Sequence, residues 1–109
     1  MKLMTKEVIG AFEKQGDTSE KKAEDIFIVC KFFNPVGNGT WYCYEYFPDD
    51  RIFMGFADLG MGPECSEAGT ISLAELEEFK GMMGLGIERD LYFKSGKYTL
   101  KQIMDGKRP

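Results

Sequence analysis

The chain has 109 residues and a formal net charge of −4, with 18 acidic and 14 basic side chains and no histidine. A chain of this length can bury one hydrophobic core but not two, so we expect a single domain over residues 1–109. The lack of histidine excludes a Ser-His-Asp triad, a Cys-His pair and the zinc sites that use histidine. We expect no cofactor and no metal.

No apolar run approaches the roughly 18 residues that a membrane span requires, so we expect no membrane association. The opening residues, MKLMTKEVIGAFEKQG, lack the apolar core and cleavage site of a signal peptide. The cysteines, Cys30, Cys43 and Cys65, are odd in number and lack CxxC spacing, which favours reduced thiols over a disulfide framework. Together these features predict a cytoplasmic protein.

The first predicted helix begins after Thr5 and ends at Gly16, with Val8, Ile9 and Phe12 on one apolar side. Residues 17–25, DTSEKKAED, are predicted to form a solvated linker.

Residues 26–59 contain three runs rich in aromatic and β-branched side chains, separated by two turn sequences, which predicts three antiparallel strands in a meander. The first turn, at residues 35–38, places Cys30 opposite Cys43 and Phe32 opposite Trp41. The second, at residues 48–51, places Phe47 opposite Ile52. Side chains alternate across a strand, so the two faces differ. The core face, under the helices, is predicted to hold Ile26, Ile28, Cys30, Phe32, Trp41, Cys43, Phe47, Met54 and Phe56, and the other face Phe27, Val29, Lys31, Phe33, Tyr42, Tyr44 and Tyr46, with Tyr44 opposite Gly55.

Residues 60–69 are predicted to form a glycine-rich loop, followed by a short strand at residues 70–71. Ser72 and Glu75 have the spacing of a capping box and begin a helix whose apolar side carries Leu73, Leu76 and Phe79. Further predictions are an edge strand with Leu91 and Phe93, a last short helix that begins at Thr99 with Leu100, Ile103 and Met104 inward, and a frayed tail at residues 107–109.

These elements predict an α+β fold. It consists of an antiparallel four- to five-stranded meander sheet, two main helices packed on one face and a short C-terminal helix.

The motifs KLMTKE, TWYCYE, SLAELEEF and GLGIERDLYF follow one another along nearly the whole chain. In this order they resemble the uncharacterised domain-of-unknown-function 2958 family, and the GLxIERDxxF block is the most specific part. The resemblance implies a small single-domain protein found largely on bacterial mobile elements such as plasmids and phages. It implies no known activity, substrate or catalytic residue. From the resemblance we expect that Trp41, Glu45 and residues 87–93 belong to the family pattern.

The stripe of Tyr42, Tyr44 and Tyr46 is the feature most suggestive of a binding surface, because tyrosine offers a large contact area with a polar tip. The alternative is that a helix or the C-terminal segment covers these rings, so that the sheet has two buried faces. An acidic rim formed by Asp49, Asp50 and Asp58 is the second predicted contact surface for a protein partner.

Glu88, Arg89 and Asp90 are the densest charge cluster beside apolar residues. Arg89 could bind an anion while a neighbouring carboxylate acts as acid, base or metal ligand. A structural ion pair is the simpler interpretation. Glu45 lies between apolar neighbours, where an unpaired carboxylate is costly, so we expect it to pair with Arg89 or with the strand end beside Lys31. The alternative is that the face assignment slips at the strand end and Glu45 is in water.

From these observations the leading hypothesis is a non-enzymatic protein-interaction or regulatory module of a mobile genetic element, with inhibition of a host defence protein as one specific version. One alternative is a small enzyme that uses Glu45, Glu88, Arg89 and Asp90 on a metal or phosphate ester. Another is a regulator that binds nucleic acid, although the negative net charge argues against it. The sequence leaves the oligomeric state and the identity of the partner open.

Overall fold

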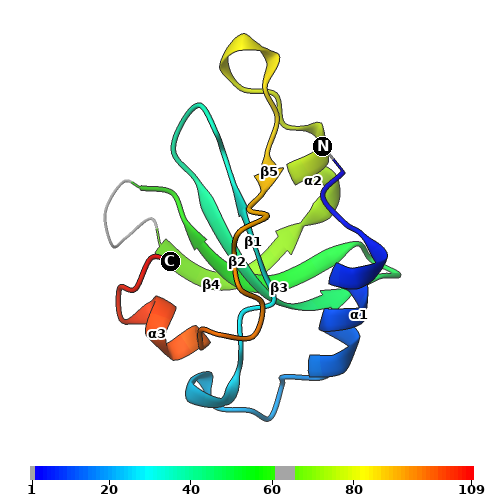
Figure 1. The fold of residues 1–109 in the computed structure, drawn as a ribbon, viewed down its shortest axis with the longest axis vertical. Coiled ribbons are helices and arrows are strands. Elements are labelled where there is room, and N and C mark those ends of the chain that lie inside the picture. The colour runs from blue at the N-terminus through cyan, green and yellow to red at the C-terminus, as the bar shows by residue number, and fades with distance from the viewer. Residues whose placement is uncertain (1, 61–65) are drawn as a thin grey trace.

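The computed structural model describes residues 2–60 and 66–109. Its centre is a five-stranded antiparallel sheet in the order β4-β3-β2-β1-β5 (Figure 1). The first four strands form a meander, and the fifth pairs with the free side of β1. Their bounds are β1 (Cys30–Phe33), β2 (Thr40–Phe47), β3 (Ile52–Asp58), β4 (Ser66–Ser72) and β5 (Glu88–Arg89). The predicted α+β class and the meander are confirmed.

The three α-helices begin at the capping residues that the sequence indicates. Thr5, Ser72 and Thr99 each accept a hydrogen bond from a main-chain N–H three residues later. The helices are α1 (Lys6–Gln15), α2 (Leu73–Glu78) and α3 (Leu100–Met104), with short 3₁₀ turns η1 (Ala23–Asp25) and η3 (Met82–Gly84). Within the described residues, no helix has the length and apolar character needed to cross a bilayer.

The hairpin registers are confirmed where the turns determine them: Cys30 lies opposite Cys43, and Phe47 lies opposite Ile52. A β-bulge between Cys43 and Glu45 interrupts the β2–β3 pairing, so Gly55 lies opposite Cys43 and the predicted Tyr44–Gly55 pair is wrong. A bulge adds one residue to one strand, and this reverses the side-chain alternation beyond it.

The sheet is covered on both faces by separate cores. One core lies between the sheet and helices α1 and α2, and the other lies under α3 (Figure 1). The first core contains Leu3, Met4, Phe12, Val29, Cys30, Phe32, Cys43, Phe53, Ile71, Leu73, Leu76 and Ile87. The second contains Ile26, Ile28, Tyr42, Tyr44, Phe56, Leu100 and Ile103, with Met54 packed against it.

The predicted face is wrong for Ile26, Ile28 and Val29. The N–H of Val29 donates to the carbonyl of Cys43 although Cys30 is the residue opposite Cys43, so Val29 and Cys30 both reach the first core and the alternation breaks between them. Met54 and Phe56 also lie on the face opposite to the predicted one, because the bulge reverses the face of the β2 residues 45–47 from which their faces were predicted.

Several segments predicted as irregular are ordered. Thr18 in the expected linker is buried, and η1 follows it. Of the expected glycine-rich loop, residues 66–69 belong to β4, while residues 61–65, including Cys65, lie outside the described part.

The edge strand is Glu88–Arg89, so its predicted position at Leu91 and Phe93 is wrong. Met104, predicted to point inward, is exposed.

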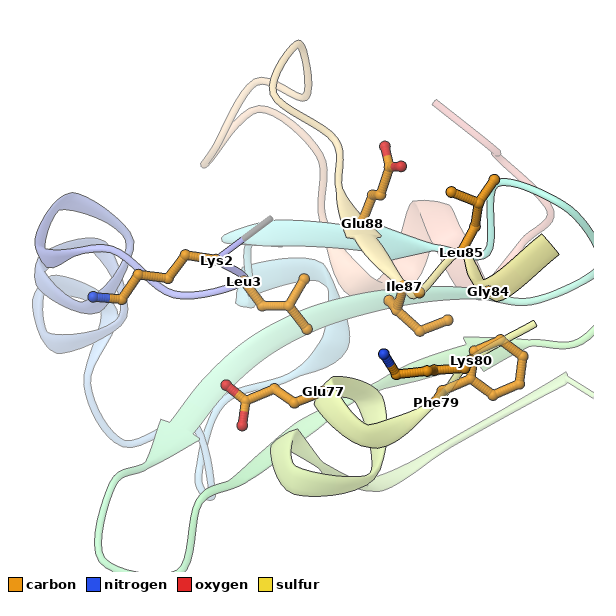
Figure 2. Close-up of a pocket in the computed structure, with 10 residues that line it drawn as sticks. Lys2, Leu3, Glu77, Phe79, Lys80, Gly84, Leu85, Ile87 and Glu88 are labelled. Carbon is orange, nitrogen blue, oxygen red and sulfur yellow. The ribbon is translucent and has the colours of Figure 1, made fainter. Parts of the chain in front are cut away.

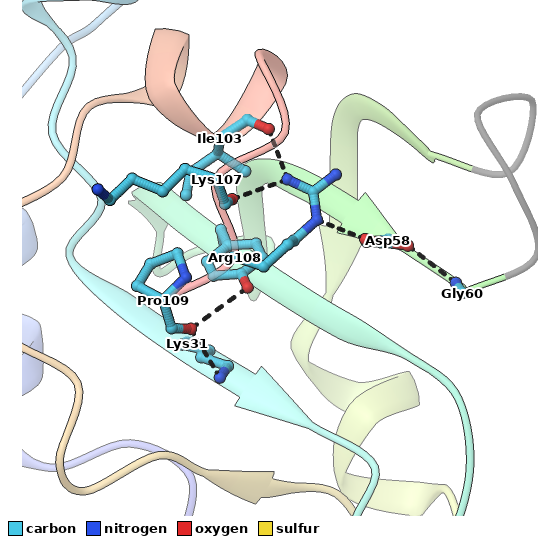
Figure 3. Close-up of polar contacts among 8 residues, drawn as sticks. Lys31, Asp58, Gly60, Ile103, Lys107, Arg108 and Pro109 are labelled. Carbon is cyan, nitrogen blue, oxygen red and sulfur yellow. Dashed lines mark hydrogen bonds and ion pairs between the residues drawn. The ribbon is translucent and has the colours of Figure 1, made fainter.

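The tail at residues 107–109 is packed against the sheet, so its predicted fraying is wrong. Arg108 donates hydrogen bonds to the carbonyls of Ile103 and Lys107 and pairs with Asp58 (Figure 3). The main-chain oxygen of Pro109 accepts from Lys31 at 2.9 Å. The tail thereby closes one side of the second core.

Candidate functional site

The tyrosine stripe does not form an exposed surface. Tyr42 is 1% exposed and Tyr44 is 6% exposed, both in the core under α3, and the Tyr42 hydroxyl contacts the Pro109 oxygen. Burial raises the pKa of both phenols above the ordinary value of tyrosine. Of the two alternatives that the sequence leaves open, the structure shows the covered stripe.

Tyr46 lies on the opposite face from Tyr42, contrary to the predicted face. The bulge turns Tyr46 toward α1, where its ring centroid is 5.9 Å from that of Phe12 and 4.9 Å from that of Phe53. The three tyrosines therefore cannot contact one partner together.

The three aspartates of the predicted acidic rim lie at two ends of β3. Asp49 and Asp50 are exposed in the turn before this strand. Asp58 is its last residue and binds Arg108 at 2.6 Å, and its other carboxylate oxygen accepts from the N–H of Gly60. Seven residues of strand separate the two positions by about 20 Å. The aspartates are thus two separate acidic positions on the surface.

Glu45 is bound by the segment that follows α1. Its Oε1 accepts from the main-chain N–H of Thr18 at 3.0 Å and from the Thr18 hydroxyl at 2.5 Å. The predicted pairing of Glu45 with Arg89 or near Lys31 is wrong, because the bulge and the buried Thr18 satisfy this carboxylate at the opposite end of the hairpin.

The side chains of Arg89 and Asp90 point to opposite sides of the sheet. Arg89 donates to the carbonyls of Lys2 at 3.2 Å and Leu3 at 2.6 Å, so it connects β5 to the N-terminal segment. Asp90 pairs with Lys31 at 3.4 Å. Both are structural contacts, as the interpretation of this charge cluster as a structural ion pair predicts. Arg89 contacts main-chain carbonyls here, where carboxylates were expected.

The predicted polar site is not assembled in one place. Glu45 lines a pocket beside α1, whereas Glu88 lines a different pocket near α2. Within residues 2–60 and 66–109, no three acidic or cysteine side chains are grouped so that they could hold a metal ion. The buried thiols Cys30 and Cys43 are free, and burial raises the pKa of Cys43 well above its ordinary value.

A groove that the sequence analysis did not predict lies between α2 and the β1–β2 hairpin. We call it the Trp41 groove; its volume is about 410 Å³. Leu59 is 36% exposed and Phe79 is 41% exposed. The apolar lining of the groove consists of Trp41, Ala57, Leu59, Ile71, Leu76, Phe79 and Ile87. The polar lining consists of Asn34, Asn38, Thr70, Ser72 and Glu75.

The β1–β2 hairpin positions the Trp41 ring at this groove. Gly39 has φ +124°, and a Cβ at this position would lie 2.8 Å from the Trp41 ring. Only glycine combines this backbone conformation with such close contact to the ring. The apolar periodicity assigned Trp41 and Phe79 to the core, so nothing in the sequence pattern distinguished a half-open groove from a filled interior.

A second pocket adjoins the Trp41 groove and shares Phe79 and Ile87 with it. This pocket, of about 500 Å³, lies between the N-terminal segment, α2 and β5 (Figure 2). Two lysines, Lys2 and Lys80, and two glutamates, Glu77 and Glu88, line it. The lining is of mixed charge, and the Glu77 carboxylate also pairs with Arg51, which lies outside the lining.

Carboxylates border the Trp41 groove. Near it, β4 and α2 carry the exposed side chains of Glu67, Glu75 and Glu78. On the α3 side, Lys97 and Lys107 both lie 5.4 Å from the centre of the Tyr98 ring.

The fold and the groove define a small α+β protein with an open antiparallel sheet and an apolar groove bordered by carboxylates. Residues 3–105 match the family model described as "Protein of unknown function (DUF2958)", so the chain belongs to this family. Neither the search of curated proteins nor the search of solved structures found a match.

Proposed function

We propose that this protein is a non-enzymatic interaction module that binds a basic segment of another protein in the Trp41 groove. The observation that carries the proposal is an apolar groove with a partly exposed lining, bordered by carboxylates. Apolar pockets with a few polar groups are typical binding sites, and charge complementarity selects among partners. Glu75 lines the groove itself, and the net charge of −4 extends the attraction to a basic partner.

The proposal includes a setting and a class of target. The family resemblance supports a mobile genetic element of bacteria as the source, and the free thiols of Cys30 and Cys43 support the cytoplasm as the location. The proposed target is a host or element-encoded protein, and a host defence protein with a basic surface suits the carboxylates beside the groove.

The two alternatives receive less support. An enzyme that uses Glu45, Glu88, Arg89 and Asp90 requires these side chains in one pocket. Glu45 and Glu88 line different pockets, and Glu45, Arg89 and Asp90 are held by separate partners. A nucleic-acid-binding role requires free positive charge, and three of the cations on the α3 side are in ion pairs with aspartates. These pairs are Lys31–Asp90, Lys101–Asp105 and Arg108–Asp58.

Affinity purification from a bacterial lysate tests the proposal with two matched variants. Phe79 and Phe27 are both 41% exposed, but only Phe79 lines the groove. We expect the wild type and Phe27→Ser to retain the same partner, identified by mass spectrometry, and Phe79→Ser to lose it. Retention is expected to fall with ionic strength because the partner is basic. A partner held equally by both variants, or held regardless of salt, would contradict the proposal.

A further inference from the structure

The outer edge of β4 exposes main-chain groups that pair with no strand in the described residues. One position beyond the last β3–β4 pair, the N–H of Leu73 donates to the carbonyl of Arg51 at 3.0 Å. In an antiparallel ladder, successive residues point their main-chain groups alternately toward and away from the neighbouring strand. The odd-numbered residues of β4 therefore bond to β3, and Ala68 and Thr70 direct their N–H and C=O groups outward.

This edge lacks the features by which proteins usually protect an edge strand. Such features are short length, proline, bulges and several charged side chains. β4 has seven residues and no proline, and its register with β3 is continuous from Asp58↔Ser66 to Ile52↔Ser72. Ala68 and Thr70 are exposed, and Glu67 is the only charged residue of the strand.

The open edge borders the Trp41 groove. Thr70, Ile71 and Ser72 of β4 line the groove. Gly69 is on the same face as Ile71, and a Cβ built on Gly69 would have no atom within 4 Å. A chain paired with β4 would lie about 4.8 Å away, and every second side chain would point to the face that carries the groove.

Resting on the function proposed above, we infer that the partner segment binds as an additional β-strand on the outer edge of β4. Its main chain pairs with Ala68 and Thr70, which together offer two donors and two acceptors. An apolar side chain of the segment enters the Trp41 groove over Gly69. Basic side chains beside it face Glu67 and Glu75.

Charge identifies the occupant as a basic segment of another protein rather than a second copy of this chain. A second copy carries the same net charge of −4 and presents its own Glu67 at the same edge. Two such edges repel each other, whereas an extended segment with lysine or arginine at intervals complements the edge.

The test uses a phage-displayed library of random nine-residue peptides, selected on the wild-type protein. Thr70→Pro removes one outward N–H and leaves the β3–β4 hydrogen bonds intact, because proline is accepted on an edge strand where the N–H faces solvent. Thr70→Val, which keeps the N–H and a β-branched side chain, is the matched control. We expect selected peptides that alternate apolar and basic residues. Their affinity, measured by fluorescence anisotropy, should be at least about 10-fold weaker for Thr70→Pro than for Thr70→Val, since the two variants share the loss of the hydroxyl and differ in the N–H.

A second measurement needs only the wild-type protein. When a selected peptide binds, hydrogen exchange followed by NMR should slow at the amides of Ala68 and Thr70. The amides of Gly69 and Ile71, which already bond to β3, should change little. Failure to select any peptide, equal binding to Thr70→Pro, or slowed exchange at all four amides alike would overturn the inference. A wild-type dimer that Thr70→Pro converts to a monomer would also overturn it, since the occupant would then be a second copy.

The outcome for this inference is separable from that for the proposed function. If the captured partner is lost with Phe79→Ser but retained by Thr70→Pro, the groove binds a protein without strand pairing and only the inference fails. If both variants retain the partner, both fail.

Discussion

The two edge strands of the sheet are built in opposite ways. β5 has two residues, both charged, and Arg89 connects it to the carbonyls of Lys2 and Leu3. β4 has seven residues, and small or uncharged side chains occupy most of it. An edge strand that is short, charged and covered resists pairing with other chains, whereas a long edge strand with few charges can pair with them.

The difference shows that one edge is covered by a neighbouring segment, whereas no strand of residues 2–60 and 66–109 pairs with the outer side of the other. The N-terminal segment lies across β5 through Arg89, and Asp90 adds the Lys31 ion pair on the other face. At β4 the neighbouring feature is a groove with apolar lining. The open edge and the groove lie on the same side of the molecule, which is why we assign partner binding to that side.

The largest expected effect comes from placing proline at a position of β4 whose N–H points inward to β3, compared with a position whose N–H points outward. Gly69→Pro removes an N–H that bonds to β3 and should lower the free energy of unfolding by about 2–3 kcal/mol, whereas Thr70→Pro should cost less than about 1 kcal/mol. Gly69→Ala is the control and should change stability little, because its Cβ enters open space. Urea unfolding followed by circular dichroism measures all three variants. Equal losses for both proline variants would show that β4 is not paired as described.

At the closed edge, Arg89→Met should remove the hydrogen bonds to the N-terminal segment. We expect a loss of about 1–2 kcal/mol, since Arg89 is half-buried and charged donors contribute more than neutral ones. Amides of residues 3–5 should exchange faster with solvent. Arg89→Lys, which keeps one charged donor, should lose less. Unchanged exchange in this segment would contradict the role assigned to Arg89.

Away from both edges, Glu45→Gln tests the bond between the bulge and Thr18. Glutamine keeps one oxygen acceptor but loses the charge, so we expect a loss of about 0.5–1.5 kcal/mol in unfolding free energy. Glu13→Gln is the matched control because Glu13 lines the same pocket but is exposed. An unchanged melting temperature for Glu45→Gln would argue against this buried contact.

The smallest effect is expected at alkaline pH, from the face under α3. Burial raises the pKa of Tyr42 and Tyr44 above the value of the unfolded chain, so the folded state retains these protons longer. The contribution of the two protonated phenols to folding stability is complete below about pH 10 and is lost as the pH rises through their pKa values in the folded state. Urea unfolding at pH 9 and pH 10.5 should show lower stability at the higher pH, with a shallower decline for Tyr42→Phe. An equal decline in the variant would contradict the burial of this phenol.

The sequence was sufficient for the parts of the fold that local chemistry determines. Thr5, Ser72 and Thr99 each precede a run with helical apolar periodicity, and each caps a helix. The turn residues of the first hairpin determine the Cys30–Cys43 register. The β-bulge at Tyr44 has no local signal, and it reversed the face of Tyr46. The faces predicted beyond it could not be correct without knowledge of that extra residue.

The groove could not be predicted from the sequence for a different reason. Trp41 and Phe79 have apolar side chains at core positions, and periodicity cannot distinguish a filled interior from one left partly open. The length of β4 was also hidden, because Gly69 and Ala68 have low strand propensity. Pairing with β3 outweighs that propensity in the fold.

Hydrogen exchange of the free protein, resolved by residue along β4, tests most directly the central claim that the outer edge of this strand is open. We predict fast exchange at the amides of Ala68 and Thr70, which point outward, and slow exchange at Gly69 and Ile71, which bond to β3. Uniformly slow exchange along β4 would mean that its outer edge is already covered, and the assignment of partner binding to this edge would be wrong.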